Sequence, residues 1–368
     1  MRARLLGVLA AATALATAAC TTSTGGQGGP GGPATLERAV ALADDVEDAD
    51  LVAGVTVTAD GTALVWTLGA AGRAGVTVVD LPENGSPAVA GDTVRLQDVE
   101  LDLALTAGGE TLLVGRVGSP YDGRYAVLAV DPASGDVLDT RPVAGTEDAG
   151  QVEAAALPDG TVVVAGDRPG GLPFVLLVAP LEGRVISAAA IDVSDVADAA
   201  DRVRVDALTV SPDGTTIAVT LAVRGEDGSA WTPAVAVLET DPFSPGDVVA
   251  LDGDGVSALA VSDDGIAYVA TEGTTGLAAV DAATGTVREV PGEPGLGEVT
   301  GLAVVGDDVV AVDRRLRVVR LDPADGSATA VADLCDDTGA AAGVAVAPDG
   351  SLVVAANCAG AGLWVLPA

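Results

Sequence analysis

Residues 207–219 read ALTVSPDGTTIAV, with an apolar segment on each side of a short Ser-Pro-Asp-Gly stretch. An Asp-Gly pair supplies the positive φ that a tight hairpin needs, so this stretch predicts two antiparallel strands joined by a two-residue turn. The Asp-Gly pair recurs at residues 60–61, 159–160, 264–265 and 349–350, and Gly108-Gly109 and Asp307-Asp308 stand as degenerate copies in the two gaps. The chain therefore repeats one hairpin seven times.

The repeats have a regular period and a regular pattern. Counted on the second turn residue, their spacings are 48, 51, 54, 51, 43 and 42 residues, which is the period of a four-stranded propeller blade. Large and small side chains alternate before each turn, as expected for a strand packed between neighbouring blades. Four residues before the second turn residue stand Val57, Leu105, Ala156, Val210, Val261, Val304 and Val346, and five before it stand Thr56, Ala104, Ala155, Thr209, Ala260, Ala303 and Ala345.

A second turn, with Asp at its start and Gly at its end, separates the third and fourth strands of most units, as in residues 131–135, 281–285 and 322–326. The seventh unit stops before this turn, whereas the apolar segment from Leu36 to Leu42 has no blade of its own. We expect this segment to supply the missing strand and remove the open edges of the sheet. The predicted fold is all-β: a seven-bladed β-propeller of four-stranded antiparallel blades, closed by an N-terminal strand.

The Ser-Pro-Asp-Gly turn, combined with a strand such as Val-Asp-Ala-Ala-Thr-Gly-Thr-Val at residues 280–287, resembles the YVTN and WD40-like group of bacterial propellers. This group is related to lactonase-like and quinoprotein-like propellers. The resemblance covers about residues 36–368 and implies the fold, but not the function, because propellers carry many unrelated activities. The His and the terminal Trp-Asp pairs of the eukaryotic WD40 pattern are absent.

The first twenty residues are typical of an export signal. A short basic start, Met1 to Arg4, precedes an apolar run of 12 residues, Leu5 to Ala16, that is too short to span a bilayer. The following Thr17-Ala18-Ala19-Cys20 resembles the lipobox of bacterial lipoproteins, although Thr17 stands where Leu is usual. In that family the cysteine is lipidated and becomes the mature N-terminus. The alternative is an ordinary signal peptide that is cut after Ala18 and leaves Cys20 unmodified.

The next segment, residues 21–34, is rich in Thr, Ser, Gly and Pro, the composition of a flexible tether. We therefore divide the chain into a signal peptide (1–19), a lipidated Cys20 with its tether (20–34) and a propeller domain (35–368). This organisation predicts an exported protein whose acyl chains hold it to the outer face of the cell membrane.

The charged residues exclude many activities. The chain has 53 acidic and 18 basic residues, the basic residues are all Arg, and its formal net charge is −35 without any His. Histidine acid/base chemistry, imidazole metal ligands, Ser/His/Asp or Cys/His nucleophiles, and phosphate-binding or Schiff-base lysines are therefore excluded. The negative charge repels phosphate, so we expect no nucleic-acid partner.

The loops between second and third strands and the links between blades vary in length and share one face of a propeller, here called the variable face. Binding residues concentrate on irregular loops of a rigid scaffold, so we expect any ligand site on this face. With Cys20 assigned to lipid, Cys335 and Cys358 remain as an even pair in an oxidising setting, and both fall on the variable face. We predict a disulfide between them, the alternative being two buried thiols.

Acidic residues begin three neighbouring innermost strands, at Asp102, Glu153 and Asp206, with Ser257 and Thr300 at the equivalent points of the next two. Innermost strands line the channel, so these carboxylates are candidate ligands for Ca²⁺ or another hard cation. The alternative is that they are solvated acids in a very acidic protein.

Two further features are candidate ligand contacts. Trp231 lies in the long loop of the fourth unit, where it is positioned to be an exposed contact. Arg314, Arg315 and Arg317 are closely spaced and could clamp a carboxylate or phosphate, or else pair with neighbouring acids.

These observations favour a monomeric, non-catalytic module that binds a protein or small molecule on the variable face. The alternative is a divalent-cation-dependent hydrolase or lyase of the lactonase-like type, in which carboxylates at the channel mouth hold the metal.

Overall fold

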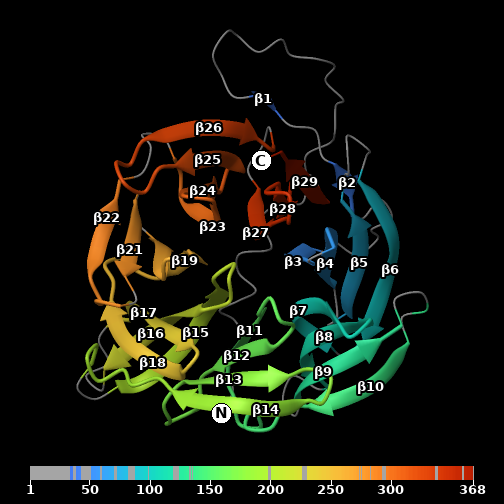
Figure 1. Cartoon of the computed structure of the whole chain (residues 1–368), viewed down its shortest axis with the longest axis horizontal. Coiled ribbons are helices and arrows are strands. Elements are labelled where there is room, and N and C mark those ends of the chain that lie inside the picture. Colours follow the sequence, from blue (N-terminus) through green and yellow to red (C-terminus); the bar gives the residue numbers. More distant parts are fainter. Residues whose placement is uncertain are drawn as a thin grey trace, which may run out of the picture. The chain divides into compact units, whose positions relative to one another are not determined.

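The computed structural model describes residues 34–35, 39–42, 51–58, 60–69, 73–81, 88–97, 99–118, 124–131, 134, 136–197, 200–225, 230–272, 274, 276–281, 283–291, 296–335, 339–358 and 360–367. Every regular element in these residues is a β-strand. The strands of residues 35–368 form seven antiparallel sheets arranged as blades in a ring around a common centre (Figure 1). Among the described residues, no helix is long and apolar enough to cross a membrane.

The first four blades follow the chain in order from the channel outward. Blade 1 contains β3 (Leu51–Val57), β4 (Thr62–Gly69), β5 (Arg73–Asp80) and β6 (Val89–Gln97). Blade 2 contains β7 (Val99–Ala107), β8 (Glu110–Val117), β9 (Arg124–Val130) and β10 (Val137–Pro142). Blade 3 contains β11 (Val152–Ala156), β12 (Val162–Gly166), β13 (Phe174–Ala179) and β14 (Arg184–Ala190). Blade 4 contains β15 (Ala200–Val210), β16 (Thr216–Gly225), β17 (Thr232–Thr240) and β18 (Phe243–Ala250).

The last three blades complete the ring. Blade 5 contains β19 (Val256–Val261), β20 (Ile266–Thr271), β21 (Leu277–Asp281) and β22 (Val287–Val290). Blade 6 contains β23 (Val299–Val305), β24 (Asp308–Asp313), β25 (Arg317–Leu321) and β26 (Ala328–Asp333), with the short β1 (Ala34–Thr35) beside β26. Blade 7 contains β27 (Ala340–Val346), β28 (Leu352–Asn357) and β29 (Ala361–Leu366), with β2 (Val40–Ala41) as its outer strand. The predicted fold is confirmed, whereas the sequence pattern did not indicate β1.

An N-terminal strand closes the ring, as predicted. Val40 of β2 pairs antiparallel with Leu363 of β29. The backbone N–H of Ala39 donates to the Leu363 carbonyl at 2.9 Å, and that of Leu42 donates to the Ala361 carbonyl at 3.2 Å. The strand occupies only the end of the predicted segment, whose residues 36–38 lie outside the described part of the chain.

A side chain adds a second connection at the same junction. The Asn357 side chain, at the end of β28 in blade 7, accepts the Val52 N–H at 2.8 Å through Oδ1 and donates to the Val52 carbonyl at 3.1 Å through Nδ2. Val52 belongs to blade 1, so this amide satisfies both backbone groups of a residue in the neighbouring blade.

Substituting Leu42 with alanine tests the closure. Leu42 is 9% exposed and packs in a cluster with residues of blades 7 and 1, so Leu42→Ala should lower the free energy of unfolding by about 2 kcal/mol. The measurement is urea unfolding, and Leu138→Ala, at a side chain that is 67% exposed, is the control expected to change stability by less than about 0.5 kcal/mol. Equal effects for the two variants would show that β2 is not part of the core.

The inner turns at the Asp-Gly pairs differ from the prediction, whereas the Gly108-Gly109 turn is confirmed, because Ala107 pairs directly with Glu110 and both glycines have positive φ. In blade 3 the N–H of Leu157 donates to the Thr161 carbonyl at 2.8 Å, so the Asp-Gly pair lies in a three-residue loop and not in a two-residue turn. Only the glycine adopts positive φ, 84° at Gly160, while the Asp159 carboxylate accepts the Thr161 N–H at 2.8 Å. Aspartate is therefore used as a turn cap and glycine as the left-handed residue.

The turn of the sixth hairpin also lies at a different position from the predicted one. Val305 pairs directly with Asp308, which makes Gly306-Asp307 the two-residue turn, with Gly306 at φ 61°. The predicted Asp307-Asp308 turn was therefore one residue too far along the chain.

The core lies between adjacent blades. Its members are mostly Val, Leu and Ala, as the low aromatic content requires, and one cluster joins Leu64 and Trp66 of blade 1 to Leu113 and Leu128 of blade 2. Trp66 fits because Gly54 lies beneath it, where an added Cβ would stand 2.1 Å from the indole. Small residues on one strand thus make room for large ones on the next.

Candidate functional site

The variable face carries a ring of equivalent positions near the start of the innermost strands. In six blades the strand register shifts there, and the extra residues are Ala53, Asp102, Asp206, Ser257, Thr300 and Ala342. In blade 3 the equivalent Glu153 pairs regularly with Ala165. The acids and hydroxyls named in the sequence thus occupy equivalent positions of neighbouring inner strands. Most of them lie at β-bulges, which the sequence did not reveal and which change the direction of the side chain.

Asp102 is paired inside its own blade. The hydroxyl of Tyr125, on the third strand, donates to Asp102 Oδ2 at 2.6 Å. Burial raises the pKa of the Asp102 carboxyl to about 8, with a further contribution from Glu153 and Glu100, while the Tyr125 hydrogen bond opposes the rise. Burial also raises the pKa of the Tyr125 phenol well above its ordinary value.

The next two acids have different surroundings. Burial raises the pKa of Glu153 to about 7, the charge of Asp206 adds to the rise, and the Gln151 side-chain amide, at 3.4 Å, opposes it. Asp206 forms an ion pair with Arg204 in its own strand. Each carboxylate therefore has its own partner.

The three carboxylates do not form a metal site. Among the residues that the structure describes, no group of three or more His, Cys, Asp or Glu side chains is arranged to hold an ion. The geometry thus gives no support to Ca²⁺ binding by Asp102, Glu153 and Asp206.

Trp231 is part of an arginine cluster in blade 4 and is only partly exposed. The guanidinium of Arg224 lies 5.1 Å from the indole centroid, and that of Arg204 lies 5.6 Å from it. Contacts of this kind stabilise the packing of the blade, so the indole is less available as an exposed contact than the sequence suggested.

The arginines of blade 6 contribute both side-chain and backbone contacts. The side chain of Arg314 forms an ion pair with Glu298 at 3.0 Å, as the alternative interpretation expected. The backbone N–H groups of Arg315 and Arg317 donate to Asp313 Oδ1 at 2.8 and 3.0 Å.

Asp313 is the important residue of this segment, and sequence reasoning missed it. It is fully buried, and its other oxygen, Oδ2, accepts the N–H of Gly297 at 3.0 Å. Between Arg315 and Arg317 lies Leu316, a buried residue at φ 57°, in the left-handed region that leucine rarely adopts. One carboxylate therefore holds a strained turn and the preceding link between blades together.

The predicted disulfide is confirmed. Cys335 follows β26 in the link between blades 6 and 7, Cys358 follows β28, and the bonded residues have a Cα–Cα distance of 6.2 Å. Both lie on the variable face. A crosslink over a loop of this length stabilises the fold by about 3 kcal/mol in the chain-entropy treatment.

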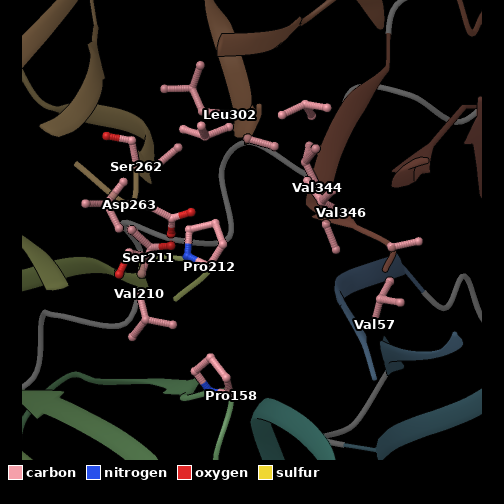
Figure 2. Close-up of a pocket in the computed structure, with 18 of the residues that line it drawn as sticks. Val57, Pro158, Val210, Ser211, Pro212, Ser262, Asp263, Leu302, Val344 and Val346 are labelled. Atoms are coloured by element: carbon pink, nitrogen blue, oxygen red, sulfur yellow. The ribbon is translucent and has the colours of Figure 1, made fainter. Parts of the chain in front are cut away.

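A large cavity lies at the opposite end of the channel, among the inner hairpin turns. Its volume is about 1240 Å³. Val57, Pro158, Val210, Leu302 and Val346, from five different blades, surround it (Figure 2). This cavity lies on the uniform face, whereas the ligand site is predicted on the variable face.

The rim of this cavity is acidic. Asp60, Asp263, Asp264 and Asp307 line it together with one base, Arg288, among the residues that the structure describes. A hydrogen bond from the Thr58 hydroxyl lowers the pKa of Asp60, which lines the rim. The Ser351 N–H likewise lowers the pKa of Asp349 in the seventh turn.

Comparisons with known proteins show the fold alone. No family model matches the chain, and no curated protein matches it. The crystal structure of BamB from Moraxella catarrhalis contains a chain that is 16% identical, with a TM-score of 0.53 over 87% of this chain and 84% of that chain. The crystal structure of the mitotic checkpoint complex contains one that is 15% identical, with a TM-score of 0.58 over 96% of this chain and 99% of that chain.

Proposed function

We propose that the protein is an exported, lipid-anchored propeller that acts as a non-catalytic interaction module. The anchor rests on the resemblance of residues 17–20 to a lipobox and on the tether-like composition of residues 21–34. Residues 1–33, including Cys20, lie outside the described part of the chain. Cys20→Ser should abolish incorporation of labelled palmitate and release the protein from the membrane fraction, and membrane association that persists in this variant would contradict the anchor.

The observation that carries the interaction role is the open cavity on the uniform face. It is lined by aliphatic side chains on a closed ring, and its polar residues include turn acids, hydroxyls and one base, Arg288. No His or Lys exists in the sequence to serve as a base or nucleophile there. Large solvent-open apolar surfaces on propellers are suited to binding a partner.

One observation favours the second candidate, a metal-dependent hydrolase or lyase. The pKa values of Asp102 and Glu153, about 8 and about 7, lie near neutrality, where a carboxyl can exchange protons. The metal that this reaction needs has no arranged ligand group among the described residues.

Thermal unfolding separates the two candidates. An interaction module should melt at the same temperature in millimolar Ca²⁺ and in excess chelator, because a ligand stabilises only a protein that binds it. A rise of several degrees in Ca²⁺ that is reversed by chelator, and lost in Asp102→Asn or Glu153→Gln, would overturn the proposal in favour of the metal-dependent enzyme.

A further inference from the structure

We propose that the cavity on the uniform face binds a basic polypeptide segment, which inserts aliphatic side chains into the channel mouth and places cationic side chains on the aspartate rim. This inference rests on the proposed interaction function and names the chemistry of the partner.

The interior of the cavity selects aliphatic groups. Val57, Val210, Val304 and Val346 line it and remain partly exposed. They come from four different blades, so the apolar surface encircles the channel, as Figure 2 shows for three of them. An inserted aliphatic side chain would contact several blades at once and cover surface that the fold leaves open to water.

The rim selects positive charge. Four carboxylates line the cavity, those of Asp60, Asp263, Asp264 and Asp307. The single base among the described lining residues, Arg288, donates a hydrogen bond to the Pro323 carbonyl of the next blade. The rim therefore keeps a strong negative field around an apolar centre, and a channel mouth with low-dielectric walls concentrates such a field.

Size and charge together indicate a polypeptide. A volume of about 1240 Å³ exceeds the roughly 300–1,000 Å³ of ordinary small-molecule pockets. Anionic lipids, nucleic acids and a second copy of this chain, whose net charge is −35, are repelled by the rim. A segment that alternates basic and aliphatic residues complements both parts of the surface.

The direct test uses three end-capped heptapeptides as probes: alternating Arg and Leu, alternating Glu and Leu, and alternating Arg and Ser. Isothermal titration calorimetry with the full propeller domain should show one-to-one binding of the Arg/Leu peptide at low salt. The Glu/Leu peptide should not bind, and the Arg/Ser peptide should bind at least about tenfold more weakly, a difference of about 1.4 kcal/mol.

Matched variants locate the binding. Asp264→Asn with Asp307→Asn removes two exposed rim charges, and should weaken the Arg/Leu peptide about tenfold. The control, Asp192→Asn with Asp195→Asn, makes the same charge change at two exposed residues of a link on the variable face and should leave the affinity unchanged. Val346→Thr keeps the β-branched shape, and should weaken the Arg/Leu peptide several-fold without affecting the Arg/Ser peptide.

Three results would overturn the inference: equal binding of the Arg/Leu and Glu/Leu peptides, equal loss in the rim and control variants, or equal affinity for the Arg/Leu and Arg/Ser peptides. The last would show attraction to an acidic surface without insertion into the channel. None of these results alters the Ca²⁺ melting test, so failure of this inference is distinguishable from failure of the proposed function.

Discussion

Asp313→Ala should lower the free energy of unfolding by about 4 kcal/mol, the largest loss that we expect from a single substitution in this chain. The carboxylate accepts the backbone N–H groups of Gly297, Arg315 and Arg317 from a fully buried position. Alanine would leave these donors without their acceptor. It would also leave Leu316 in a left-handed conformation that costs energy without the bonds that hold it there.

Urea unfolding monitored by circular dichroism measures this loss. Asp313→Asn keeps one acceptor oxygen, so it should destabilise the protein by about half as much. Asp322→Ala is the matched control, because that half-buried carboxylate caps a turn by accepting the Ala324 N–H at 2.8 Å, and its loss should stay below about 1 kcal/mol. If Asp313→Ala and Asp322→Ala had similar effects, the buried network would not be a principal support of the fold.

The second large effect concerns pH and Asp102. Because burial raises the pKa of this carboxyl from 3.8 to about 8, the folded protein prefers the protonated form. The folded state is therefore favoured at low pH. The free energy of unfolding falls as the pH rises from about 4 to about 8, where the buried group must ionise. At 1.36 kcal/mol per pKa unit, the full loss would be about 6 kcal/mol, an upper value because Glu153 ionises in the same range.

Asp102→Asn should remove most of this slope. The amide can still form a hydrogen bond with the Tyr125 hydroxyl, and it carries no charge at any pH. Urea unfolding at pH 5 and pH 8.5 should therefore show similar stabilities for the variant and the parent at pH 5, and a more stable variant at pH 8.5.

Asp325→Asn provides the charge-matched control for this experiment. Its exposed carboxylate has a lowered pKa because it accepts the Ser327 N–H, so its replacement should not stabilise the protein at pH 8.5. A parent whose stability rises between pH 5 and pH 8.5, or an Asp102→Asn variant with an unchanged slope, would show that the Asp102 carboxyl ionises freely in the fold.

The seven blades could be predicted because their signal is local and repeated. Glycine is needed at each left-handed turn position, as at Gly160 and Gly350, and side-chain alternation is imposed by packing on both faces of a strand. The closing strand followed from the same template, since it was the element left over once the blades were assigned. The Cys335–Cys358 bond followed from the cysteine count, with Cys20 assigned to lipid, and from the position of both residues on the variable face.

The remaining features depend on contacts that no local pattern encodes. The bulge at Asp102 arises where β7 and β8 pair, and Gly115 permits it by lying against the Glu100 carbonyl, where a Cβ would stand 2.1 Å away. The role of Asp313 depends on Gly297, which belongs to the link before its own blade. The arginines of this segment could be identified as candidates because residue type gives the charge, whereas the burial of Asp313 cannot be read from residue type.

The cavity lies on the uniform face, whereas the ligand site is predicted on the variable face, because binding residues usually concentrate on irregular loops. The short turns are what leave the channel mouth open, with partly exposed aliphatic residues such as Val57 and Val346 inside it. A repeated turn can therefore be structural in each blade and form a surface when seven of them converge.

The pairing of Val40 with Leu363 also adds a long-range step to folding. Blades 1 to 5, and the four strands β23 to β26 of blade 6, each come from a contiguous run of chain, so they can form as the polypeptide emerges from the ribosome. Blade 7 joins residues from both ends of the domain, and loop closure over such a separation is slow because its entropic cost comes before any contact forms. Until that last step an unpaired edge of β29 stays available to other chains, so the interval before ring closure is when this protein is most exposed to misassembly.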